Sequence, residues 1–231
     1  MNPPINDVRS RMGVRLRSRG VFLAVAALTF VLSIKGGVLS LVGLAIALLT
    51  LWAIRWDWSF FGTGRVRWLG DLLRAAKYTA VLVLLVDALA QPCVDRLLET
   101  RPDLSGFTFL VGNLPNLLFF LAFMWVVAAF GEEFFFRGYL MRGWARTFGD
   151  GRRGWLLGAA LSTLPFGLAH IYQGPSGVIN TALVGAVLAV QFYRGRDRLA
   201  SCMLTHGLYD TVGLVAIYLG KPFLFSKIFF S

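Results

Sequence analysis

Three groups of ionisable residues lie within or at the ends of long apolar stretches of the sequence, where charges are costly. They are Glu132, Glu133 and Arg137 in the pattern EExxxR, His170 in the pattern FxxxH, and His206 and Asp210 in the pattern HxxxD. The chain has no other histidines. Histidine gains and loses a proton near neutral pH, and a glutamate in a low-dielectric cavity can take and return one. These residue types therefore suit general acid–base chemistry on a buried water molecule.

Helical spacing indicates which of these side chains can pair. Glu133 and Arg137 are four residues apart, so they lie on one face of a helix and can form an ion pair. Glu132 points about 100° away from Glu133, which leaves it free for another role. Asp210 follows His206 by four residues and shares its helical face. The alternative is that both glutamates only mark the solvated end of an apolar helix, and that each histidine is a structural hydrogen-bonding residue.

Other reaction types have less support from the sequence. A zinc ion held by Glu132, His170 and His206 is an alternative, because two histidines and a glutamate form a known catalytic zinc set. The HExxH pattern common in zinc peptidases is absent, however, and we expect a site without metal or other cofactor. No GxSxG pattern supports a serine nucleophile. The two cysteines, Cys93 and Cys202, show no metal-ligand spacing.

The elements that carry these residues are predicted to be membrane helices. Of the 231 residues, 57% are hydrophobic and 15% are charged, whereas soluble domains are about 25% charged. The apolar runs are continuous rather than alternating, which favours an all-α polytopic bundle over a β-barrel. We predict seven transmembrane helices, within a range of six to eight. The runs are Val21 to Ile34, Val38 to Ile54, Tyr78 to Pro92, Phe109 to Phe130, Trp155 to Ile171, Val178 to Tyr193, and Leu199 to Leu219.

The basic residues between the runs indicate an orientation. If the N-terminus is cytoplasmic, the inner segments hold 18 of the 23 lysines and arginines. We therefore predict a multi-pass protein of the cytoplasmic membrane, with residues 1–20 as a basic cytoplasmic segment and 21–231 as a single transmembrane domain. The apolar tail at 222–230 leaves a further span open. The net charge of +11 suggests contact with anionic lipid rather than nucleic acid, because the basic residues are not interleaved with aromatic ones.

Spacing along the chain also predicts how the groups meet. Glu132 and His170 each lie 19 residues from a glycine-containing turn centred near position 151, so antiparallel helices would place them at matching height. Residues 173–176 should interrupt the helix at a depth within the membrane. Non-helical backbone is tolerated there only where it lines a water-filled cavity. Asp87 is a fourth acidic residue in an apolar run, and we expect a structural hydrogen bond there.

The three motifs, in this order and each on its own apolar helix, resemble the CPBP family of CAAX proteases and bacteriocin-processing enzymes. The resemblance covers about residues 109–219. It implies a glutamic-type intramembrane endopeptidase in which Glu132 and His170 activate water. His206 and Asp210 would form the group that stabilises the developing oxyanion. We expect Asp210 to orient His206, because an anionic carboxylate would repel an oxyanion.

Three residues of the motifs are assigned supporting roles. Glu133 and Arg137 are interpreted as a scaffold pair that leaves Glu132 unpaired, and Phe166 as a packing residue. Asp210 stands where prenyl-processing members of the family usually have Asn, which puts a prenylated substrate in doubt more than hydrolysis itself.

The resemblance implies a membrane-tethered peptide or protein tail as substrate, with the lipid bilayer as the surrounding partner and no nucleic acid. One alternative is a sorting protease that removes the C-terminal anchor of exported proteins. Another is a non-enzymatic membrane chaperone or immunity protein that keeps the fold and only binds a partner. Retention of all three motifs favours an enzyme.

Overall fold

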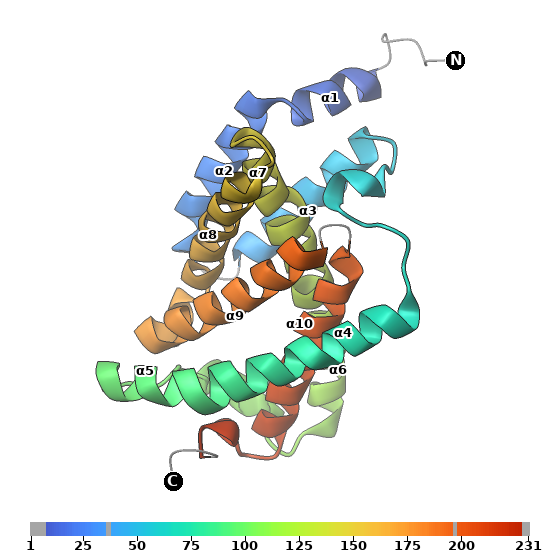
Figure 1. Cartoon of the computed structure of the whole chain (residues 1–231). Coiled ribbons are helices and arrows are strands. Elements are labelled where there is room, and N and C mark those ends of the chain that lie inside the picture. The colour runs from blue at the N-terminus through green and yellow to red at the C-terminus, as the bar shows by residue number, and fades with distance from the viewer. Residues whose placement is uncertain (1–7, 36–37, 196–197, 228–231) are drawn as a thin grey trace.

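The computed structural model describes residues 8–35, 38–195 and 198–227. Most of these residues are helical, and the described chain contains an isolated β-bridge between Thr63 and Arg198 but no strand (Figure 1). The predicted all-α class is confirmed.

Helices occupy all seven of the predicted apolar runs. The principal helical segments are α1 (Val8–Leu16), α2 (Arg19–Ser33), α3 (Val38–Ala53), α4 (Trp68–Val81) continuing through the π-helical η2 (Leu82–Ala90) into α5 (Gln91–Leu98), α6 (Leu114–Met124) continuing through the π-helical η4 (Trp125–Met141) into α7 (Arg142–Thr147), α8 (Arg152–Leu168), α9 (Gly174–Gly195) and α10 (Leu199–Tyr218). Short 3-10 turns are η1 (Trp58–Phe61), η3 (Ser105–Leu110), η5 (Ile171–Gln173) and η6 (Phe225–Lys227).

Membrane crossing receives partial support from the lengths of these helices. Two helical stretches in the described residues, Leu114–Thr147 and Ile171–Gly195, are long and apolar enough to cross a bilayer by length and composition. The helices Arg19–Ser33 and Ser40–Ala53 are apolar but shorter. The seven helical runs are therefore present, whereas seven crossings remain a prediction.

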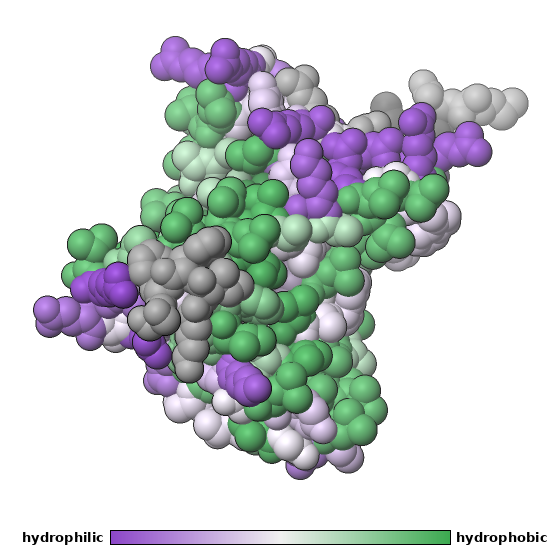
Figure 2. All heavy atoms as spheres, turned by 60° about the horizontal axis from the view of Figure 1, so that its bottom comes forward, coloured by the Kyte–Doolittle hydropathy of each residue, from purple (hydrophilic) through white to green (hydrophobic). Residues whose placement is uncertain are grey.

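Much of the outer surface is apolar, as expected for helices that contact lipid. Large hydrophobic side chains such as Leu118, Phe119 and Val126 on the long helix are exposed. Figure 2 shows hydrophobic residues spread over the middle of one face, with hydrophilic residues gathered mainly towards its upper margin. A soluble monomer rarely exposes such extended apolar areas, so this surface supports membrane association.

The π-helical segment η4 lies at the centre of the packing. It contacts α3, α8 and α10, and its consecutive rings Phe134, Phe135 and Phe136 are fully buried in the largest hydrophobic cluster. The EExxxR motif belongs to this segment. Because π-helical stretches in α-helices are rare and often occur at functional sites, the location of the motif in η4 favours a functional role for its residues.

The position of α10, which carries His206 and Asp210, is fixed by polar contacts with two other helices. Gln191 on α9 donates from Nε2 to the hydroxyls of Ser201 and Thr205, over 3.0 and 2.9 Å. At the start of α10, Arg198 forms an ion pair with the buried Asp71 of α4 over 2.5 Å. These contacts set the height of α10 relative to its neighbours.

Some predictions fall partly outside the described residues. Of the basic segment 1–20, residues 1–7 lie outside, and the remainder forms α1 and the start of α2. Residues 228–231 of the apolar tail also lie outside. The described part of that tail contains only the short turn η6.

Candidate active site

The two glutamates of the first motif are buried. Glu132 is 6% exposed, Glu133 is fully buried and Arg137 is 1% exposed. The helix that carries them continues to Thr147, well past the predicted run end at Phe130. The alternative that these glutamates merely mark a solvated helix end is therefore wrong.

Glu133 joins two helices through one carboxylate oxygen. Its Oε1 accepts a hydrogen bond from Arg137 Nη1 over 2.7 Å, which is the predicted i, i+4 pair. The same oxygen lies 2.9 Å from His206 Nδ1. Because an ionised carboxylate only accepts, His206 Nδ1 carries the hydrogen and donates it. Glu133 therefore orients His206 as well as pairing with Arg137.

The Arg137 guanidinium extends this network to α8 and α9. Its Nη2 donates to the carbonyl oxygen of Gly185 over 3.0 Å, and its Cζ lies 4.3 Å from the centre of the Phe166 ring. A Cβ atom at position 185 would lie 2.8 Å from the Phe166 ring, so only glycine permits this approach. Phe166 thus packs as predicted and also supports a buried cation.

Glu132 is held by a residue of α3. Ser40 Oγ donates to Glu132 Oε1 over 2.5 Å, and both side chains are buried. One turn further along α3, a Cβ at Gly43 would lie 2.5 Å from the Phe135 ring. The missing side chain lets α3 approach η4 closely enough for this hydrogen bond to form.

His170 lies just beyond the end of α8 and has a defined tautomer. Its Nδ1 is 3.1 Å from the carbonyl oxygen of Phe166. A carbonyl can only accept, so Nδ1 carries the hydrogen. In the neutral ring, Nε2 then presents its lone pair and can act as a base.

His206 and Asp210 share a face of α10, as predicted. The distance between His206 Nε2 and Asp210 Oδ2 is 3.6 Å, at which a protonated ring would form an ion pair, but it is too long for a strong hydrogen bond. Asp210 Oδ2 is buried without a hydrogen-bond partner. Since Nδ1 is already held by Glu133, Nε2 is the ring nitrogen left for a reacting group.

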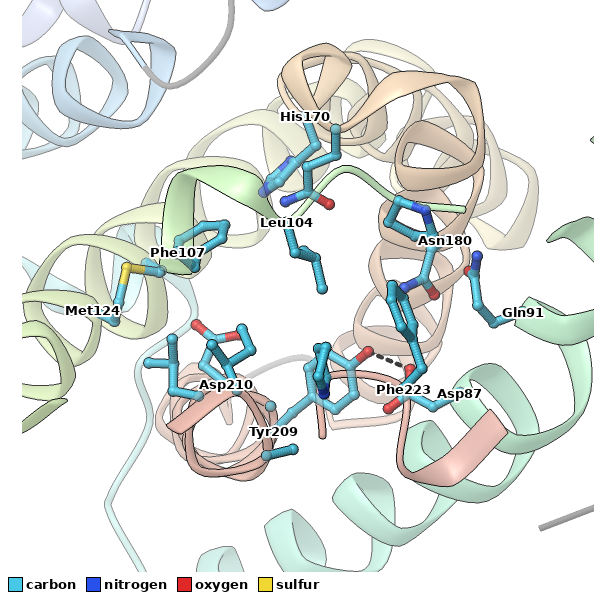
Figure 3. A pocket seen from close by; sticks show the side chains of 18 of the residues that line it. Asp87, Gln91, Leu104, Phe107, Met124, His170, Asn180, Tyr209, Asp210 and Phe223 are labelled. Atoms are coloured by element: carbon cyan, nitrogen blue, oxygen red, sulfur yellow. Dashed lines mark hydrogen bonds between the residues drawn. The ribbon is translucent and has the colours of Figure 1, made fainter. Parts of the chain in front are cut away.

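These groups meet around one cavity of about 220 Å³. Glu132 from η4, His170 from the end of α8, and His206 and Asp210 from α10 all line it. Figure 3 shows His170 directed into the cavity, with Asp210 on another part of its wall. Gln173, which lies where the helical path is interrupted between α8 and α9, also lines the cavity. The cavity is large enough for ordered water beside several polar partners.

A comparison with protein-family models matches residues 114–212 to the family described as Type II CAAX prenyl endopeptidase Rce1-like. The chain contains a CPBP-family domain. The match falls within the predicted limits of 109–219 and confirms the resemblance stated from the three motifs. No curated protein and no solved structure matches the chain.

The CPBP domain supports a protease-like function, and its family is membrane-embedded. Residues 114–212 include η4 and both histidines but end before Tyr218, the last residue of α10. They do not include α3. Ser40, which contacts Glu132, therefore comes from outside the matched CPBP domain.

Two contacts in and around the CPBP domain were missed by sequence reasoning. The pairs are Ser40 with Glu132, 92 residues apart, and Glu133 with His206, 73 residues apart. Neither pair has a local spacing signal, and a single serine in an apolar run is common. Only the buried location of Glu132, if known beforehand, would have indicated that it needs a donor.

Within the described part of the CPBP domain, Glu132 and His170 are not joined by a direct hydrogen bond, although both line the cavity. A group of three or more His, Cys, Asp or Glu residues placed to hold a metal ion is not found among the described residues. The arrangement can support general acid–base chemistry by residues that share a cavity rather than touching.

Asp87 of η2 makes the structural hydrogen bond that was expected. Its Oδ1 accepts from the hydroxyl of Tyr209 on α10 over 2.7 Å. Asp87 also lines the cavity, so this bond connects η2 to α10 directly beside the candidate site.

Proposed function

We propose that the protein is a glutamic-type intramembrane endopeptidase that hydrolyses a membrane-tethered peptide. The observation that carries this proposal is that Glu132, His170, His206 and Asp210, which all belong to the matched residues 114–212, line one cavity. A buried acid, two imidazoles and space for water are the components that peptide hydrolysis by activated water requires.

Glu132 and His170 are proposed to activate the water. The Glu132 carboxylate takes a proton from water while the water oxygen bonds to the carbonyl carbon of the scissile peptide. The same carboxyl group then returns the proton to the leaving nitrogen as the C–N bond breaks. The Nε2 lone pair of His170 accepts a hydrogen bond from the water and orients it, since Nδ1 is held by the Phe166 carbonyl.

His206 is proposed to stabilise the negative oxygen of the tetrahedral intermediate. With Nδ1 donating to Glu133, the imidazolium form can donate from Nε2 to the oxyanion. A donor of this kind contributes about 3 to 4 kcal/mol to transition-state stabilisation. Asp210, 3.6 Å from Nε2, balances the charge of the imidazolium rather than contacting the oxyanion.

The proposed location is the cytoplasmic membrane of a bacterium, with the N-terminus in the cytoplasm. The excess of basic residues in the segments assigned to the inside supports this orientation. The proposed substrate is a membrane-anchored protein or peptide, which reaches the cavity from the bilayer. No metal and no other cofactor takes part in the proposed reaction.

A comparison of membrane proteomes tests this function. A strain lacking the gene is complemented with wild-type protein, with Glu132→Gln or with Glu99→Gln, a matched change at an exposed glutamate. We expect protein tails that are shortened in the wild-type and Glu99→Gln strains to stay intact in the Glu132→Gln strain. Normal processing by Glu132→Gln at equal membrane abundance would rule out the proposed chemistry.

A further inference from the structure

One wall of the cavity presents hydrogen-bond acceptors that the proposed hydrolysis does not use. These are the side-chain oxygens of Asp87 on η2, Gln91 on α5 and Asn180 on α9. In Figure 3 the three side chains lie together along one side of the cavity, across from Phe107 and Met124.

Gln91 has a fixed amide orientation. Its Nε2 donates to Asp95 Oδ1 over 2.5 Å and to Ser176 Oγ over 2.7 Å. A flipped amide would place the Gln91 oxygen against the Asp95 carboxylate, so the assignment of oxygen and nitrogen is secure on hydrogen-bonding grounds. Gln91 is 4% exposed, and its Oε1 is buried without a partner.

Asn180 and Asp87 add acceptors beside Gln91. Asn180 Oδ1 is likewise buried without a hydrogen-bond partner. One oxygen of Asp87 accepts from the Tyr209 hydroxyl, which leaves the second carboxylate oxygen for another donor. Tyr209 is followed directly by Asp210, so the acceptor wall and the candidate catalytic groups are joined through consecutive residues of α10.

The charge of the cavity has the opposite sign to that of the protein. Three carboxylates line it, from Asp87, Glu132 and Asp210, and no lysine or arginine is among its described lining residues. The chain as a whole has a formal net charge of +11. An acidic cavity in a basic protein favours a cationic group in the bound molecule.

We propose that this wall is a substrate subsite for a primary ammonium group, namely a lysine side chain close to the scissile bond. The proposal rests on the proposed function and narrows its substrate class. An ammonium has three donors and no acceptor, which matches three acceptor oxygens from three helical segments. Arginine fits less well, because its planar fork binds both oxygens of one carboxylate and Tyr209 already occupies one oxygen of Asp87.

The rest of the cavity suits the remainder of a lysine side chain in an apolar peptide. Leu104 and Phe107 from the η3 region, Phe120 and Met124 from α6 and Phe223 after α10 all line it. Four methylene groups can lie along these side chains while the ammonium reaches the acceptor wall.

Peptide cleavage in nanodiscs of phosphatidylcholine, a zwitterionic lipid, tests this subsite. The probes are internally quenched peptides with a common apolar membrane anchor, in which successive positions hold lysine, arginine or norleucine. At one position we expect kcat/KM to be at least about tenfold higher for lysine than for norleucine, because the norleucine peptide leaves the acceptors unpaired. Asp87→Asn should reduce this ratio several-fold, whereas Asp150→Asn, a charge-matched change on an exposed turn outside the cavity, should retain it.

A binding measurement separates failure of the subsite from failure of the function. The same peptides are titrated by fluorescence anisotropy against Glu132→Gln protein, with and without Asp87→Asn. Lysine-selective binding without any cleavage by the wild type would refute the hydrolase and retain the subsite. Equal affinity for the lysine and norleucine peptides at every position, or a preference that survives Asp87→Asn, would overturn the subsite. If Asp87→Asn fails to fold, Asn180→Asp should raise the lysine preference, and an unchanged or lower preference would count against the subsite.

Discussion

Replacing Ser40 with alanine is expected to slow peptide hydrolysis about 10- to 150-fold while the protein still folds. The basis is the 2.5 Å hydrogen bond from Ser40 Oγ to Glu132 Oε1, which is buried on both sides. A hydrogen bond to a charged group contributes about 1.5 to 3 kcal/mol, and about 1.4 kcal/mol corresponds to a tenfold change in rate. If this bond positions the carboxylate for the transition state, its loss appears in kcat rather than in KM.

The assay is steady-state cleavage of a membrane-anchored quenched peptide by purified protein in nanodiscs. Ser33→Ala serves as a matched control, because Ser33 is also buried and its hydroxyl donates over 2.7 Å to a backbone carbonyl of its own helix. This control should keep wild-type kcat. Unfolding temperatures of both variants are measured in parallel to show that each protein folds.

Two outcomes would show that Ser40 does not position Glu132 for hydrolysis. One is a kcat for Ser40→Ala equal to or above that of the wild type. The other is a loss of kcat in the Ser33→Ala control as large as that in Ser40→Ala, since the loss would then be a general effect of removing a buried serine hydroxyl. Either result would mean that α3 is only a packing element at this point.

Three further predictions follow from the buried charges and from the proposed chemistry. Arg137→Met should lower the free energy of unfolding by about 3 to 5 kcal/mol, because it leaves Glu133 buried without its cation, and equilibrium unfolding in detergent that shows no loss would contradict the ion-pair role. Asp210→Asn should retain more activity than Asp210→Leu, because Asn keeps a polar partner near His206, and equal losses would argue against an orienting role. Cleavage should persist after treatment with a strong chelator, whereas a loss that added zinc restores would establish a metal enzyme.

The sequence was sufficient for the fold class and for the segments that carry the site. Long, continuous apolar runs have a strong compositional signal, and each run became helical. The turn near position 151 was predicted by its glycines, and helices end at Thr147 and begin at Arg152 on either side of it. The number of membrane crossings is less determined, because a helix of about 15 residues can be tilted, partly embedded or buried in protein.

The partners of the site residues could be predicted only where the spacing is local. Glu133 and Arg137 are one turn apart and form the expected pair. The bond from Glu133 to His206 and the bond from Ser40 to Glu132 depend on how η4, α3 and α10 pack, which no spacing within one helix specifies. The continuation of the long helix towards the turn near position 151 agrees with the predicted antiparallel arrangement, whereas the burial of Glu132 and Glu133 shows that the alternative of a solvated helix end is wrong.

The decisive test of the proposed hydrolysis is the cleavage rate of Glu132→Gln, His170→Ala and the double variant. Each protein is inserted in nanodiscs and is first shown to have the thermal stability of the wild type. We expect each single change to reduce cleavage to the background rate and the double variant to be no slower than either, because the two residues act on one water molecule. Cleavage by Glu132→Gln at the wild-type rate would contradict the central claim that an acid and two imidazoles around one cavity carry out the hydrolysis.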